Sequence, residues 1–273
     1  MNLKLILLLL PLMATPARAE SGMPNMEQAM DKMQGGSAPP DARDPGAYAA
    51  GLELDLKPGL DMADDDPYYR VLTEELEYFN GNEGHGFQLD GQAWVGGDLN
   101  KLWLEFEGGR QNGETTASRT ELLWDRNIAT YWSTQIGVRH DAHEGPGRDW
   151  LAFGLQGMAP YWFEVEAMAY IGENGRTAFR GEVSYDLLLS QRLVLQPNLE
   201  LNAYGKDDAD REIGSGLSDV DLALRLRYEF WREFAPYIGI SYQRKYGQTA
   251  DYASARGEDI DEARVMIGLR LWY

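Results

Sequence analysis

Apolar and polar residues alternate along most of the chain after residue 67. The clearest case is the stretch 262–273, in which every second position from Ala263 to Tyr273 is apolar. Glutamate, arginine and glycine occupy most of the positions between them. Strict alternation over a strand's length places one face of the strand against an apolar environment and the other against a polar one. This stretch is therefore predicted to be a two-faced β-strand.

Similar segments recur along the chain, and with the last one they give twelve predicted strands. Their length of about ten residues is what a tilted strand needs to cross a membrane. An even number of strands is also what a single-chain barrel requires when both of its ends lie on the same side of the membrane. The predicted strands are 71–79, 87–95, 101–107, 119–125, 132–139, 150–158, 161–169, 179–187, 193–202, 219–229, 236–244 and 262–273.

The connections between these strands alternate in length. Every second one is short, and most of the others are longer and rich in Gly, Asp, Asn and Glu, notably 108–118, 141–149, 205–217 and 247–260. Outer-membrane barrels have short periplasmic turns and long outer loops. The sequence thus predicts an all-β fold, a transmembrane antiparallel outer-membrane β-barrel of about 12 strands over residues 67–273. A soluble β-sandwich is the alternative, because periodicity does not reveal what covers the apolar face.

The residues before the barrel differ in character from those after it. Residues 1–19 have the pattern of a signal peptide, with Lys4, an apolar core at 5–13 and a small-residue cleavage site at 17–19. Residues 20–66 contain Gly and Pro breaks and are predicted to form a flexible periplasmic arm. The expected location is the cell outer membrane, reached by export.

Composition narrows the possible functions of the chain. It has 273 residues, a net charge of −19 and no cysteine. The acidic balance argues against a nucleic-acid partner. Absence of cysteine excludes disulfides, iron-sulfur clusters and thiolate zinc sites. No serine and histidine pair has a distinctive catalytic spacing, so the chain is predicted not to be an enzyme.

The arm carries the main candidates for metal binding. Met23, Met26, Met30 and Met33 have helical spacing, which would place four thioethers along one face. Thioether sulfur is a soft ligand that selects Cu(I). The alternative is a small amphipathic helix, or a flexible arm that uses methionine as an adaptable apolar residue.

The polar faces of the predicted strands hold weaker candidates. Met168 and Met266 share these faces with charged residues, where they either relay copper or fill space. His85, predicted in an outer loop with His140 and His143, is a possible Cu(II) ligand or simply exposed. The charged residues form either a salt-bridged filling or a cation path. They are Glu164, Glu166, Glu182, Asp186, Glu200, Asp219, Asp221, Glu229, Arg139, Arg180, Arg225, Arg227, Arg264 and Arg270.

Residues 90–108 read DGQAWVGGDLNKLWLEFEG, and this stretch resembles the copper-resistance protein B family. The stretches 160–176, 187–208, 213–219 and 232–237 are similar to it too, so that the resemblance covers nearly all of 44–273. It implies an outer-membrane protein of copper homeostasis and resistance. Family members often carry long Met- and His-rich repeats in the arm, whereas the Met-bearing segment here has four methionines and no histidine.

These observations together predict a copper-binding protein of the outer membrane. It would capture Cu(I) through Met23, Met26, Met30 and Met33, and sequester copper or pass it across the membrane. The expected partners are the copper ion, outer-membrane lipid and a periplasmic copper-binding protein, and the barrel is expected to be a monomer. The alternative is a general small-solute channel or structural barrel with incidental methionines.

Overall fold

The computed structural model describes residues 67–116, 118–142 and 147–273. Twelve long antiparallel strands make up most of this part of the chain, and two further strands, β4 and β10, have two residues each. The predicted signal peptide, arm and four arm methionines lie outside the described residues. The strands are β1 (Tyr68–Gly81), β2 (Gly84–Gly96), β3 (Asn100–Gln111), β4 (Glu114–Thr115), β5 (Ser118–Ala129), β6 (Trp132–Ala142), β7 (Arg148–Ala159), β8 (Phe163–Gly172), β9 (Thr177–Ser184), β10 (Leu187–Leu188), β11 (Leu193–Tyr204), β12 (Gly216–Tyr228), β13 (Phe234–Lys245) and β14 (Asp261–Trp272).

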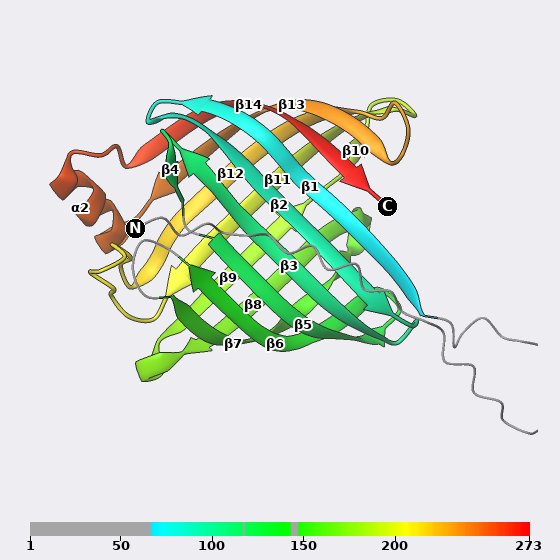
Figure 1. Ribbon diagram of the computed structural model, residues 1–273, viewed down its shortest axis with the longest axis horizontal. Coiled ribbons are helices and arrows are strands. Elements are labelled where there is room, and N and C mark those ends of the chain that lie inside the picture. The colour runs from blue at the N-terminus through cyan, green and yellow to red at the C-terminus, as the bar shows by residue number, and fades with distance from the viewer. Residues whose placement is uncertain (1–66, 117, 143–146) are drawn as a thin grey trace, which may run out of the picture. The chain divides into compact units, whose positions relative to one another are not determined.

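The long strands pair in sequence order and close into a ring (Figure 1). β14 pairs with β1, for example Ile267 with Tyr78, and β11 pairs with β9 as well as with β12. The short strand β10 pairs with β11, outside the ring. One sheet that closes on itself is a barrel, so the predicted twelve-stranded barrel is confirmed and the β-sandwich alternative is wrong.

The two rims of the barrel differ. One rim carries the turns 97–99, 130–131 and 229–233, and the other carries the longest loops, 205–215 and 246–260. The predicted loop 247–260 contains a helix, α2 (Gly247–Arg256), which lies at the left end of the barrel in Figure 1. Gly257 ends this helix in the left-handed conformation, with φ of 78°. The two longest connections therefore lie at one rim, as predicted, but one of them is partly helical.

One predicted strand begins too early. The stretch 161–169 was predicted as a strand, whereas β8 begins at Phe163. The preceding residues, Pro160–Trp162, form a 3-10 turn, η2, in which Tyr161 and Trp162 have φ of 67° and 69°. Left-handed backbone cannot continue the pleat of a strand, so the turn displaces the strand start by two residues.

The wall separates an apolar outer face from a polar interior. On β14, Val265 and Ile267 are 66% and 59% exposed and face outward, while Met266 between them is 3% exposed and faces inward. The other strands follow the same alternation, and Leu, Val, Ile, Phe and Tyr dominate the exposed large side chains. Among the described residues, no helix has the length and apolar composition needed to span a membrane.

Glycine allows close approach at one point in the barrel interior. Gly268 lies opposite Tyr237, and a Cβ atom at Gly268 would lie 2.4 Å from Cζ of that ring. The ring cannot turn away freely, since the Tyr237 hydroxyl donates to Oε2 of Glu77 at 2.9 Å. The Tyr237 ring therefore fills the space that a side chain at position 268 would need.

Replacing Gly268 with alanine is expected to lower the free energy of unfolding by about 1 to 3 kcal/mol, because overpacking forces the ring or backbone to shift. Urea unfolding of the refolded barrel in detergent, followed by gel mobility without heating, measures this. Gly181→Ala is the control, because a Cβ atom there meets only side-chain atoms at 3.2 Å or more. If both substitutions lower the free energy of unfolding equally, the Tyr237 ring does not require glycine at position 268.

Candidate functional site: the barrel lumen

The interior of the barrel contains two cavities, of about 420 Å³ toward the rim with the long loops and about 460 Å³ toward the other rim. We call them the outer and inner cavities. They share eight lining residues, so they meet at one level of the barrel, which we call the waist. The waist consists of Glu74, Glu75, Gln92, Gln156, Glu166, Glu182, Asn198 and Arg225.

A ladder of carboxylates crosses four neighbouring strands at and above the waist. Glu166 on β8 lies opposite Glu182 on β9, which lies opposite Glu200 on β11. Glu200 in turn lies opposite Asp221 on β12. Like charges directly opposite each other destabilise a sheet. The ladder therefore requires a counter-charge.

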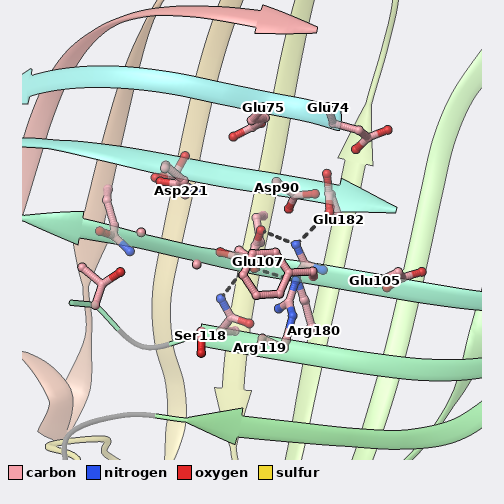
Figure 2. A pocket seen from close by; sticks show the side chains of 18 of the residues that line it. Glu74, Glu75, Asp90, Glu105, Glu107, Ser118, Arg119, Arg180, Glu182 and Asp221 are labelled. Carbon is pink, nitrogen blue, oxygen red and sulfur yellow. Dashed lines mark hydrogen bonds and ion pairs between the residues drawn. The ribbon is translucent and has the colours of Figure 1, made fainter. Parts of the chain in front are cut away.

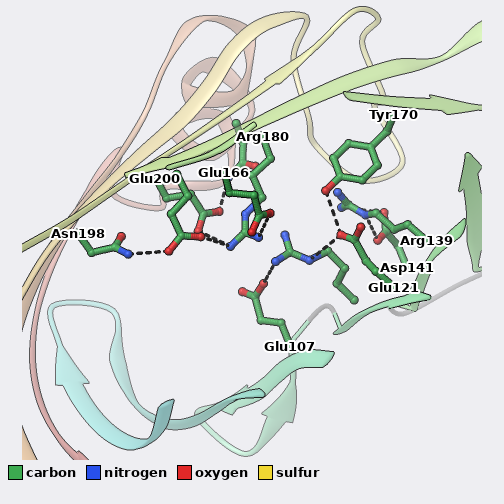
Figure 3. Close-up of polar contacts among 12 residues, drawn as sticks. Glu107, Glu121, Arg139, Asp141, Glu166, Tyr170, Arg180, Asn198 and Glu200 are labelled. Atoms are coloured by element: carbon green, nitrogen blue, oxygen red, sulfur yellow. Dashed lines mark hydrogen bonds and ion pairs between the residues drawn. The ribbon is translucent and has the colours of Figure 1, made fainter. Parts of the chain in front are cut away.

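Arg180 provides that counter-charge (Figure 3). Its guanidinium nitrogens lie 2.8 Å from Glu200, 3.1 Å from Glu182 and 3.7 Å from Glu166. A side-chain amide also donates a hydrogen bond to one of these carboxylates, from Asn198 to Glu182 at 2.7 Å. One buried arginine thus holds three carboxylates together.

A second network, formed by residues of β3, β5 and β8, lies beside the Arg180 cluster (Figure 3). Arg119 lies 2.7 Å from Glu107 and 3.3 Å from Glu121. The Tyr170 hydroxyl donates to Glu121 at 3.0 Å. Further pairs around the lumen are Arg139 with Asp141, Arg225 with Glu75 and Glu77, Arg227 with Asp186 and Glu229, and Arg264 with Glu262. The predicted salt-bridged filling is present.

Among the described residues that line the outer cavity, carboxylates nevertheless outnumber arginines by twelve to six. Figure 2 labels several of these carboxylates, among them Asp90 and Glu105. Asp90 and Glu105 line the outer cavity without a hydrogen bond or ion pair to any other described residue. The carboxylates are those of Glu74, Glu75, Glu77, Asp90, Glu105, Glu107, Asp141, Glu166, Glu182, Glu200, Asp219 and Asp221, and the arginines are Arg119, Arg139, Arg180, Arg211, Arg225 and Arg264. Such a lining attracts cations and repels anions.

The first strands supply many of these acidic residues, including Glu74, Glu75 and Glu77 of β1, which were not among the predicted inward carboxylates. β1 contains a bulge between Thr73 and Leu76, where its pairing with both neighbours shifts. Because a bulge inserts one residue, it allows the adjacent residues Glu74 and Glu75 both to line the lumen. In the sequence, the only signal that these carboxylates face the lumen is the alternation of Glu75 and Glu77 with the apolar residues Leu76 and Tyr78.

The structure also places the weaker metal candidates. Met168 is fully buried against Leu123, Trp150 and Tyr170, whereas Met266 lines the outer cavity. Both face inward as predicted. His85 and His140 were predicted in loops, but they lie on β2 and β6, because these strands extend beyond the apolar segments that marked them. His143 is outside the described residues, among which no group of three or more His, Asp or Glu could hold a metal ion.

Hydrogen bonds also order the loop 205–215 at the outer rim. The backbone N–H of Ser215 donates to Oδ1 of Asp207 at 2.6 Å. This bond stabilises the charged carboxylate and lowers the pKa of Asp207. The bond therefore stabilises the fold above the ordinary aspartate pKa, and that contribution is lost as the pH falls through the lowered value.

Comparison with known proteins identifies the family. The sequence model of the family described as copper resistance protein B precursor (CopB) matches residues 67–273. The chain belongs to the copper resistance protein B family. The CopB relatives include the copper resistance protein B homolog of Pseudomonas syringae pv. tomato (strain ATCC BAA-871 / DC3000), which is 46% identical over 202 residues, covering 74% of this chain and 69% of the relative. Copper resistance protein B of Escherichia coli is 42% identical over 205 residues, covering 75% and 69%.

A solved structure shares the fold of this CopB barrel. The NanC porin superposes with a TM-score of 0.52 at 13% identity, covering 72% of this chain and 98% of the porin. The resemblance that the sequence suggested is thus confirmed. The chain is a copper resistance protein with an outer-membrane β-barrel fold.

Proposed function

We propose that this CopB protein captures copper as Cu(I) through Met23, Met26, Met30 and Met33, and that it sequesters the metal or passes it as a cation through its lumen. In this proposal the barrel catalyses no reaction and binds and transfers its cargo. The observation that carries the lumen part is the excess of carboxylates around the outer cavity. The thioether part follows from ligand softness and helical spacing.

The charge of the lumen distinguishes this proposal from a general small-solute channel. A polar channel without charge preference would have a balanced lining, whereas here carboxylates outnumber arginines two to one around the outer cavity. A cation that enters the outer cavity would pass carboxylates from several strands. Reversal potentials across a planar bilayer with a salt gradient test the preference. Cation selectivity supports the proposal, and anion selectivity or none at all contradicts it.

Changing the four arm methionines together to leucine is expected to abolish Cu(I) binding by the arm without preventing folding. Leucine keeps the apolar face but removes the sulfur donors, so the variant separates coordination from packing. Competition titration with a Cu(I) chelator measures the loss. Because methionine has no titrating proton, wild-type affinity should change little between about pH 5 and pH 8, where a histidine site would weaken.

The paired change Met168→Leu and Met266→Leu is the matched control for this experiment. Both residues lie in the barrel, and Met168 is packed in a hydrophobic cluster. We expect this control to bind Cu(I) like the parent. If instead the arm variant binds Cu(I) unchanged, the arm is not the site, and the two barrel methionines become the next candidates.

A further inference from the structure

The loop 205–215 lies over the mouth of the outer cavity. It connects β11 to β12, yet it contacts β6 and β7, which are separated from β11 by β8 and β9 in the ring. Arg211 donates to the backbone carbonyl of Asp141 at 3.5 Å. Arg211 and Ile213 also line the outer cavity. The loop therefore forms part of the roof of the lumen.

Charge holds the tip of this loop to the wall. Asp208, only 5% exposed, forms ion pairs with Arg148 at the start of β7 and with Arg176 between β8 and β9. Asp208 is the one residue of the described loop that pairs with both arginines. An isolated bridge between Asp208 and Ile213 keeps the tip compact.

The base of the loop is anchored in a different way. The backbone N–H of Gly214 donates to Oγ1 of Thr249 on α2 at 2.8 Å, and Ser218 on β12 lies 3.1 Å from the same oxygen. Gly216, with φ of 89°, follows the loop, and a Cβ atom there would meet nothing within 4 Å. The loop thus has a base bound to α2 and a tip bound by ion pairs to Arg148, at the start of β7, and to Arg176, just before β9.

We propose that residues 205–215 are a gate over the outer mouth of the lumen and that Asp208 is its latch to Arg148 and Arg176. Breaking the two ion pairs removes the charged contacts of Asp208 and loosens the tip, while the bond to α2 keeps the base in place. Opening exposes the acidic outer cavity to cations from outside. This inference rests on the proposed role of the lumen as a cation path, but its test measures access to the cavity and does not depend on copper.

The experiment uses a single reporter cysteine, because the chain has none of its own. Ser241→Cys places a thiol in the outer cavity, where Ser241 is 8% exposed, and Ser184→Cys places one in the inner cavity. The reaction rate of each thiol with a trimethylammonium methanethiosulfonate is measured on the refolded full chain in detergent. Asp208→Asn removes the latch, and Asp210→Asn removes the same charge from an exposed position in the same loop.

We expect Asp208→Asn to accelerate the reaction at position 241 by about tenfold or more, since it removes the carboxylate that the two partly buried arginines, Arg148 and Arg176, share. Asp210→Asn should leave this rate unchanged, and the rate at position 184 should stay the same in every background. Arg176→Gln removes one of the two arginine partners of Asp208. This variant is used if Asp208→Asn does not fold, as judged by gel mobility without heating.

Three results would overturn the gate. Unchanged rates at position 241 with folded latch variants would show a fixed cover, and equal acceleration by Asp210→Asn would show a general charge effect. Acceleration at both reporter positions would show that the whole barrel had loosened. None of these results depends on whether the arm methionines bind Cu(I), so failure of the gate and failure of copper capture are distinguishable.

Discussion

Replacing Arg180 with glutamine is expected to lower the free energy of unfolding by about 3 to 5 kcal/mol, because it leaves an acidic cluster without its buried counter-charge. Glu166, Glu182 and Glu200 lie on neighbouring strands and share this one guanidinium. Without it, like charges face one another directly across the sheet. Urea unfolding of the refolded barrel measures the loss.

Two further variants test whether the loss comes from the unpaired carboxylates. Arg192→Gln, in an exposed turn, removes the same charge and should leave stability nearly unchanged. Arg180→Gln combined with Glu200→Gln should recover part of the loss, since removing both partners costs less than removing one. If Arg180→Gln costs no more than Arg192→Gln, the carboxylates are hydrated in an open channel.

The second large effect is expected at Asp141, near the outer end of β6. Its carboxylate accepts two bonds from Arg139, at 2.6 and 3.1 Å, and one from the indole N–H of Trp150 at 2.8 Å. Asp141→Leu leaves both donors unpaired in the interior. We expect a loss of about 3 to 5 kcal/mol in the free energy of unfolding, the cost of breaking a buried pair.

A neighbouring exposed pair provides the comparison. His140 Nδ1 lies 2.6 Å from Oδ1 of Asp149, but these side chains are 55% and 77% exposed. Exposed pairs contribute about 0 to 1 kcal/mol, so Asp149→Asn should have a small effect in the same urea titration. A loss at Asp149 as large as that at Asp141 would contradict the distinction between buried and exposed pairs.

The alternation of apolar and polar residues is enough to predict the twelve long strands, their faces and their approximate positions. Period-two alternation follows directly from the pleat of a strand, so Val265, Met266 and Ile267 were assigned to the correct faces without knowledge of their neighbours. The inward orientation of Met168 and Arg180 followed in the same way. The arm methionines lie outside the described residues, and their role stays a prediction.

Which side chains meet inside the barrel depends on the pairing of distant segments. A bulge in β1 lets Glu74 and Glu75 both line the lumen, and strict alternation assigns such neighbours to opposite faces. The three partners of Arg180 come from the register of β8, β9 and β11, and the partners of Asp208 lie on segments distant in sequence. Alternation is a local property of the backbone, whereas register, bulges and loop contacts depend on how distant segments pair, which the local pattern does not contain.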